Sequence, residues 1–184
     1  MPRDDRRFTT LCFHIDANRI NAAAKLESMN QLERWRAAGV IDIEMAEPAQ
    51  NEAMRGSSAR AEKAMNYIYA QAMAGTAGEK ELLRKIEGIL FPNGAKTANE
   101  LRDVEIVFIA GKYDCILVTN DGASRSQPGG ILGNREKLAK LRIKVCTDEE
   151  AVAVVRERIA RRDEYLRAKS RRIGTPLPAW VGCD

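Results

Sequence analysis

The chain has 184 residues, of which 45% are hydrophobic, and this length fits one domain with a short appendage. No apolar run approaches the roughly 20 residues that span a bilayer. The start of the chain, MPRDDRRF, is charged and lacks the apolar centre of a signal peptide. We therefore expect a cytoplasmic protein with no membrane segment.

The net charge of +4 comes entirely from the C-terminal part of the chain. Residues 151–184 contain 8 Lys and Arg against 4 Asp and Glu, so the totals of 30 and 26 leave 22 of each sign elsewhere. A basic tail favours a polyanionic partner such as nucleic acid. A solvated helix face explains the same excess equally well.

The first predicted elements are a buried strand at 11–15 and a helix at about 20–38, whose apolar residues recur at three- and four-residue steps. Residues 40–45, VIDIEM, alternate apolar and acidic side chains, which predicts a half-exposed or edge strand. Residues 48–90 read as helical with glycine-containing breaks. Two apolar stripes there are predicted to face the core. The stripes are Met65, Ile68, Tyr69, Ala72 and Met73, and then Leu82, Leu83, Ile86 and Leu90.

Two capping boxes mark helix starts in the second half of the chain. Thr97 and Glu100 form the first, and Thr147 and Glu150 form the second, each with the acidic residue three positions after the N-cap. The second box opens a long helix with one basic side, which Pro176 and Pro178 are expected to end. The elements expected between the two helices are a buried strand at 115–119, a loop at 122–134, a short helix at 135–141 and a strand at 143–146.

Strands that alternate with helices, and that lack polar interruptions, indicate an α/β fold. We expect three layers, α/β/α, around a mainly parallel sheet of four to five strands. The expected division is a domain at 8–155 and a basic C-terminal helix and tail at 156–184. In such folds, sites lie beyond the carboxyl ends of the strands.

The sulfur and imidazole side chains are predicted to be structural. Cys12, Cys115, Cys146 and Cys183 are far apart in sequence and form no CxxC motif, so we expect buried reduced thiols rather than a zinc site or a disulfide. His14 is the single histidine of the chain. We expect it to be a satisfied core or rim histidine rather than a metal ligand.

Four carboxylates are predicted to meet at the carboxyl edge of the sheet. Asp16 and Asp121 follow two buried strands, Asp103 lies early in the helix after the first capping box, and Glu52 lies one turn into the helix after VIDIEM. Turn and cap chemistry alone explains an isolated Asp at such positions. Four together repel one another unless a cation lies among them, and oxygen-only ligands suit Mg²⁺ or Mn²⁺. Such a site usually serves phosphate chemistry.

Three segments carry a resemblance to the PIN-domain family of metal-dependent ribonucleases, which includes the VapC-type toxins. They are HIDAN at 14–18, NEAMRG at 51–56 and DVEIVFIAGKYDCILVTND at 103–121. The last is the most specific, because it places two aspartates 18 residues apart with a helix and a strand between them. The resemblance implies a PIN-like fold and an acidic site of Asp16, Glu52, Asp103 and Asp121.

The same resemblance implies further roles. Asn18, Thr119 and Asn120 would support the acidic site, and Ser124 stands where the family often has another acid. The implied activity is an Mg²⁺- or Mn²⁺-dependent endoribonuclease that leaves a 3′-hydroxyl and a 5′-phosphate, as in the toxin of a toxin–antitoxin pair. The implied partners are RNA, an antitoxin and a second copy of the chain. RNA contacts are expected from Arg19, Arg55, Arg161 and Arg162.

Two other interpretations remain open at this point. A catalytically inactive PIN-like module that binds RNA or protein fits the same segments, and Ser124 in place of an acid favours it slightly. A different metal-dependent phosphohydrolase on a similar sheet is the third. The sequence has no P-loop and no DxD after the first strand, which argues against the common members of that third class.

Overall fold

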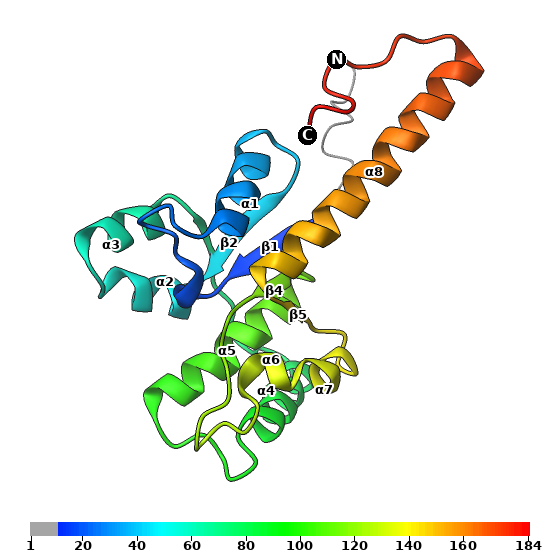
Figure 1. The fold of residues 1–184 in the computed structure, drawn as a ribbon. Coiled ribbons are helices and arrows are strands. Elements are labelled where there is room, and N and C mark those ends of the chain that lie inside the picture. The colour runs from blue at the N-terminus through cyan, green and yellow to red at the C-terminus, as the bar shows by residue number, and fades with distance from the viewer. Residues whose placement is uncertain (1–10) are drawn as a thin grey trace.

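The computed structural model describes residues 11–184 and contains a five-stranded sheet with helices packed around it (Figure 1). All strand pairs are parallel and the strand order is β3-β2-β1-β4-β5. The strands are β1 (Cys12–Ile15), β2 (Asp42–Ala46), β3 (Ile68–Ala70), β4 (Ile116–Val118) and β5 (Lys144–Cys146). The α/β prediction with a parallel sheet is therefore confirmed.

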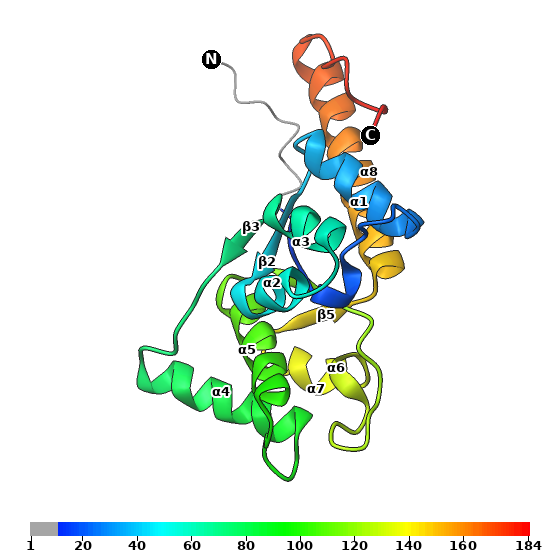
Figure 2. The same cartoon turned by 90° about the vertical axis from the view of Figure 1, so that its left-hand side faces the viewer.

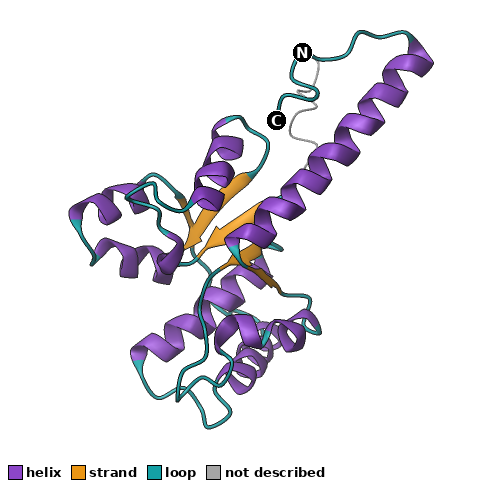
Figure 3. Ribbon diagram, viewed as in Figure 1, coloured by secondary structure: helices purple, strands orange, loops and turns teal. Residues whose placement is uncertain are grey.

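The helices occupy the connections between strands and the C-terminal part of the chain (Figure 3). They are η2 (Ala17–Arg19), α1 (Glu27–Ala37), α2 (Glu47–Met54), α3 (Ser58–Met65), α4 (Ala77–Leu90), α5 (Ala98–Lys112), α6 (Gly130–Gly133), α7 (Arg135–Ala139) and α8 (Asp148–Ile173). Helices α1 and α8 pack against each other on one side of the sheet, and α4, α5 and α7 pack together on the other (Figures 1 and 2). None of the helices between residues 11 and 184 has the length and apolar character that crossing a bilayer requires.

The strand order creates a switch point between β1 and β4. The chain progresses outward from β1 to β2 and β3, and then returns through α4 and α5 to form β4 on the other side of β1. Connections that leave two adjacent strands in opposite directions open a crevice at the carboxyl ends of those strands, where α/β proteins bind ligands. Here these carboxyl ends are followed by Asp16 and by Thr119, Asn120 and Asp121.

The core is mostly aliphatic, with a few buried aromatic side chains, and fills both sides of the sheet. Phe13, Ile15, Leu117 and Val118 are buried on the central strands, and the second predicted stripe contributes Ile86 and Leu90 from α4. Leu82 and Leu83, from the same stripe, are partly buried against this core. The prediction of a core stripe in α4 is confirmed.

The first predicted stripe is wrong, because the helix expected there ends early. Helix α3 ends at Met65, and β3 follows as the edge strand of the sheet. Met65, Ile68, Tyr69 and Met73 are exposed. The VIDIEM strand, β2, lies between β1 and β3 rather than at the edge, and its predicted half-exposed pattern is present, with Asp42 exposed and Ile43 and Met45 buried.

The helix predicted at 20–38 begins later, at Glu27. The amide of Asn21 explains the delay, since its Oδ1 accepts a hydrogen bond from the backbone N–H of Leu26 and its Nδ2 donates to the Leu26 carbonyl. Ala24 takes a positive φ of 52°. Asn21 therefore holds a loop in which its own side chain replaces the helical hydrogen bonds of the backbone.

Both predicted capping boxes are present, and a third one opens α4 at Thr76. Helix α8 is continuous through residues 155 and 156, so the expected domain boundary lies inside it, and Ile159 still packs in the core. The helix ends at Ile173 with Gly174 in the left-handed region, before the two prolines. The charged start, residues 1–8, and the first residues of the expected domain, 8–10, lie outside the described residues.

Candidate metal centre

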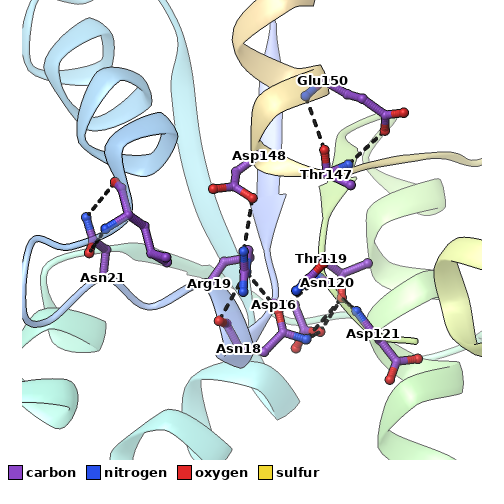
Figure 4. A network of polar contacts seen from close by, with 11 residues as sticks. Asp16, Asn18, Arg19, Asn21, Thr119, Asn120, Asp121, Thr147, Asp148 and Glu150 are labelled. Atoms are coloured by element: carbon purple, nitrogen blue, oxygen red, sulfur yellow. Dashed lines mark hydrogen bonds and ion pairs between the residues drawn. The ribbon is translucent and has the colours of Figure 1, made fainter. Parts of the chain in front are cut away.

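Asp16 is held at the end of β1 by two side-chain donors (Figure 4). Its Oδ2 accepts a hydrogen bond from the hydroxyl of Thr119 at 2.6 Å and from Nδ2 of Asn18 at 2.7 Å. The residue is only 8% exposed. A buried carboxylate with two fixed donors on one oxygen has its orientation set by the fold.

Thr119 joins the ends of the two central strands. Besides donating to Asp16, its hydroxyl oxygen accepts from the backbone N–H of Asp121 at 3.0 Å and from Nδ2 of Asn18 at 3.2 Å. One donor and two acceptor positions are all that a hydroxyl offers, so this fully buried group is saturated. Oδ1 of Asn18 accepts from the N–H of Asn120 at 3.1 Å. The three residues predicted to support the site therefore contact it or one another.

Asp121 is fixed by the loop that follows it. Its Oδ2 accepts a hydrogen bond from the backbone N–H of Ile131 at 2.8 Å. The loop is closed so tightly that a Cβ on Gly130 would lie 2.3 Å from the carbonyl oxygen of Gly122. Glycine is required at this crossing, and the closed loop keeps the Asp121 carboxylate beside the end of β4.

The other two predicted acids come from helices. Asp103 lies in the second turn of α5 and is partly buried, whereas Glu52 lies near the end of α2 and is exposed. Helix α2 contacts both α5 and η2, the short helix that follows Asp16. The structure thus brings acidic side chains from two strand ends and two helices to one edge of the sheet. We call Asp16, Glu52, Asp103 and Asp121 the carboxylate cluster.

The negative charges of these side chains raise the pKa of their neighbours in the cluster. Burial is the largest cause that raises the pKa of Asp103 to about 7, and the negative charges of Asp121, Asp16, Glu52 and Glu100 add to it. Burial also raises the pKa of Asp16, with smaller contributions from Glu52 and Asp121, while the Thr119 hydroxyl acts in the opposite direction. Burial raises the pKa of Asp121 as well. The ionised carboxylates are therefore unfavourable in this cluster unless a cation is bound.

The carboxylates of Asp16, Glu52 and Asp121 lie close enough to Asp103 for their charges to raise its pKa. Among residues 11–184, the group of metal-ligating side chains whose donor atoms all lie within 4.8 Å of one another is a different one, near the amino end of β1. Like charges that share a poorly hydrated region keep apart unless a counter-ion draws them in. The cluster supplies only oxygen donors, which is the ligand type that Mg²⁺ and Mn²⁺ prefer.

Ser124 lies apart from the carboxylate cluster. Its hydroxyl accepts a hydrogen bond from the N–H of Gln127, and its N–H donates to the Gln127 carbonyl. The residue is exposed and lines a surface hollow with Asn93 and Glu100. Its contacts are therefore those of a loop turn.

The four arginines predicted to bind RNA differ in availability. Arg55 is exposed at the end of α2, and Arg161 is exposed on α8 in an ion pair with Glu157. Arg19 is largely buried, and its Nη1 lies 3.0 Å from Oδ1 of Asp148. The fourth, Arg162, is described next.

Arg162 is buried rather than presented to solvent. It is 4% exposed, and its guanidinium contacts Asp163 and Asp184 at 2.8 Å each. The same guanidinium lies over the ring of Trp180, 4.6 Å from the ring centre. The C-terminal tail thus folds back onto α8, and Arg162 stabilises that fold instead of facing a ligand.

The sequence also failed to predict a disulfide. Cys12 and Cys115 are bonded, with their Cα atoms 4.8 Å apart, so the expectation of reduced thiols is wrong for these two. Cys146 and Cys183 are free, the first buried and the second exposed. Adjacency of β1 and β4 brings the bonded pair together, and that adjacency cannot be recognised from cysteine spacing. His14 is fully buried as predicted, but only its Nε2 has a partner, 3.3 Å from Oε2 of Glu44.

No model of a known protein family matches this chain, and no curated protein is significantly similar to it in sequence.

Proposed function

We propose that this protein is a PIN-like endoribonuclease that hydrolyses RNA phosphodiesters at the carboxylate cluster with Mg²⁺ or Mn²⁺. The observation that carries the proposal is the meeting of four carboxylates at the switch point between β1 and β4, where burial and mutual repulsion raise the pKa of Asp103 to about 7. An acidic, oxygen-only site of this kind suits phosphoryl chemistry.

The residues present fit a hard divalent cation. Asp16, Asp103 and Asp121 would hold it. The raised pKa of each means that its ionised form is unfavourable in the metal-free fold, and a bound cation would offset that free-energy cost. When bound, Mg²⁺ or Mn²⁺ would promote ionisation of the attacking water and neutralise charge that develops on the phosphoryl oxygens.

The chain's own groups would perform the remaining tasks. Thr119 and Asn18 fix the orientation of Asp16 through their hydrogen bonds to its Oδ2. Glu52, the exposed member of the carboxylate cluster, would orient the attacking water and accept its proton. Attack of water on phosphorus in line with the leaving 3′-oxygen would break the P–O3′ bond. The 3′-oxygen would take a proton from solvent, which leaves a 3′-hydroxyl and a 5′-phosphate.

Of the four arginines that the sequence predicts to contact RNA, this proposal keeps the two exposed ones, Arg55 and Arg161. Arg55 is exposed at the end of α2, the helix that carries Glu52, and is suited to a phosphate contact. The side of α8 that carries Arg161 is exposed and basic and would add to backbone attraction. Arg19 and Arg162 serve the fold through their ion pairs.

A protein partner remains part of the proposal. The edge strand β3 exposes Ile68 and Tyr69, and Met65 and Met73 on either side are also exposed. An apolar edge strand is a surface that proteins normally cover. A second copy of this chain would cover it in a homodimer, and an antitoxin would cover it in a toxin–antitoxin pair. We also propose that the protein works in the cytoplasm.

The direct test is an RNA cleavage assay with purified protein. We expect cleavage with Mn²⁺ or Mg²⁺, none with EDTA, and loss of cleavage in Asp16→Asn and Asp121→Asn. Asp42→Asn is the matched control, since Asp42 is exposed at the amino end of β2 and should leave activity unchanged. A folded wild-type chain that binds RNA but never cuts it would contradict the proposal and leave an inactive binding module.

A further inference from the structure

A second group of metal-ligating side chains lies near the amino end of β1. The side chains of Cys12, His14, Glu44 and Cys115 place one donor atom each so that all of these atoms lie within 4.8 Å of one another. We call this group the sulfur–histidine cluster. It is separate from the carboxylate cluster and has no role in the proposed RNA cleavage.

The strand register explains why these four side chains meet. Cys12 and His14 are two positions apart on β1, so they project from the same face of the sheet. Glu44 is the register partner of His14 on β2. Cys115 directly precedes Ile116, which pairs with Phe13 of β1, so Cys115 lies beside Cys12. Three neighbouring parallel strands thus contribute to one face.

The imidazole of His14 is buried, and its contacts within the fold satisfy only one of its two ring nitrogens. The residue is 0% exposed, and its Nδ1 has no hydrogen-bond partner. A buried ring nitrogen without a partner is costly and is rare in folded proteins. The other nitrogen, Nε2, is engaged only by the Glu44 carboxylate.

One donor–donor distance already matches a tetrahedral cation site, and the other donor atoms lie within 4.8 Å of one another. With metal–ligand bonds of about 2.0–2.3 Å, donor atoms in a tetrahedral site lie roughly 3.3–3.8 Å apart. Nε2 of His14 and Oε2 of Glu44 are already 3.3 Å apart. Two thiolates, one imidazole and one carboxylate form a soft-to-borderline donor set that selects Zn²⁺ over Mg²⁺ and Mn²⁺.

We propose that the reduced chain binds one Zn²⁺ ion through Cys12, His14, Glu44 and Cys115, and that zinc binding and the Cys12–Cys115 disulfide are mutually exclusive states. Conversion requires a dithiol reductant: two electrons break the S–S bond, two protons form the thiols, and the reductant becomes a disulfide. Each thiol then releases its proton as its sulfur binds the cation. A disulfide oxidant reverses the conversion: it accepts two electrons from the two sulfurs and two protons from solvent, becomes a dithiol, and the ion leaves as the Cys12–Cys115 bond forms.

Access to the cluster is from the side of Cys12 and Glu44. These two residues are partly exposed, whereas His14 and Cys115 are buried. Zn²⁺ carries two positive charges and the three anionic ligands carry three negative ones, so a net charge of about −1 remains near the half-exposed Glu44. A net charge at the solvent edge is far less costly than one at the core.

The test uses Co²⁺ as a spectroscopic probe for the site. Thiolate ligands give Co²⁺ an intense charge-transfer absorption that carboxylate ligands do not, so the carboxylate cluster cannot mimic the signal. After reduction with a phosphine, we expect the wild-type chain to develop this absorption with one equivalent of Co²⁺, and Zn²⁺ to abolish it. The oxidised chain should give none.

Variants separate this site from other thiols and acids. Cys12→Ser and Cys115→Ser should lose the absorption, and Glu44→Gln should weaken Co²⁺ binding by about tenfold or more. The exposed thiol variant Cys183→Ser and the carboxylate-cluster variant Asp121→Asn should develop the same thiolate absorption as the wild type. The proposal is overturned by a reduced, folded wild-type chain without thiolate absorption, or by equal absorption in Cys12→Ser.

A stability measurement completes the test if a cysteine variant fails to fold. Zn²⁺ at 100 times its dissociation constant stabilises the state that binds it by about 2.7 kcal/mol. We therefore expect Zn²⁺ to raise the melting temperature of the reduced wild-type chain by more than that of the oxidised chain, in which the carboxylate cluster alone can bind the ion. An equal shift in both forms would contradict the proposal. Neither result bears on RNA cleavage by the oxidised chain, so the zinc proposal and the proposed function can fail independently of each other.

Discussion

Near its carboxyl end, β1 presents Asp16 to three other carboxylates, whereas near its amino end the same face of the strand presents Cys12 and His14 beside Cys115. Both clusters lie where the central strands meet, and both contain groups that burial makes costly. The two clusters differ in their donor atoms and in the interaction that offsets the free-energy cost of burying them. The sulfur–histidine cluster is tied by a covalent bond. In the carboxylate cluster, the neighbouring negative charges raise the pKa of Asp103.

We therefore assign a structural role to the disulfide and propose a chemical role for the carboxylate cluster. The disulfide links β1 to β4 across 103 residues of sequence and holds the two strands whose other ends carry Asp16 and Asp121. The carboxylate cluster makes no such link, and its charges oppose folding. Groups that oppose folding are typical of functional sites, which need a ligand to offset the cost.

The largest expected effect comes from removing one charge of the carboxylate cluster. Asp103→Asn should reduce Mn²⁺-dependent RNA cleavage by more than about 100-fold, since changes to residues that only support metal ligands already cost about 10–100-fold. The control is Glu105→Gln, an exposed change two residues later on α5. Equal rates for the two variants would show that Asp103 is not part of the site.

Removing the disulfide should affect stability rather than chemistry. The double variant Cys12→Ser/Cys115→Ser should lose about 2–4 kcal/mol of unfolding free energy in urea titrations with EDTA present. Cys183→Ser, at an exposed free thiol, should stay within about 0.5 kcal/mol of the wild type. A double variant as stable as the wild type would show that the bond contributes nothing to the fold.

Thr119→Val keeps the shape of the side chain and deletes the hydroxyl that orients Asp16. We expect Mn²⁺ affinity, measured by calorimetry, to fall about 10–100-fold, because Asp16 loses one of its two donors and the Asp121 N–H loses its acceptor. Thr175→Val is the exposed control in the tail. Unchanged affinity in Thr119→Val would place Asp16 outside the metal shell.

The stability of the metal-free chain should fall gradually as pH rises. The pKa of Asp103 moves from an unfolded value of 3.8 to about 7 in the fold. The folded chain therefore keeps a proton that the unfolded chain releases, and this contribution is complete below about pH 4 and lost as pH rises through 7. Melting temperatures in EDTA should show the decline, and Asp103→Asn should flatten it. A variant with the same slope as the wild type would assign the decline to other groups.

Local rules were enough to predict much of this fold. The capping boxes at Thr97 and Thr147 were found because the hydrogen bonds of a capping box join residues three apart in sequence. The placement of Asp16 and Asp121 followed from a general rule about parallel sheets, which needs only the strand ends. These predictions depend on short-range chemistry or on fold class, and both can be read from one sequence.

The failures depend on contacts that are distant in sequence. The disulfide requires β1 and β4 to be neighbours, and the burial of Arg162 requires the tail to return to α8. Strand β3 has only three residues, too few for a period of two to stand out from a helical pattern. The late start of α1 depends on hydrogen bonds of one side chain, Asn21.

The most direct test of the carboxylate cluster is a crystal structure of the oxidised chain with Mn²⁺, in which anomalous scattering locates the ion. We predict an anomalous peak bound by Asp16, Asp103 and Asp121, with the sulfur–histidine cluster free of manganese. The absence of a peak among these carboxylates at saturating Mn²⁺, with their side chains directed away from one another, would contradict the account.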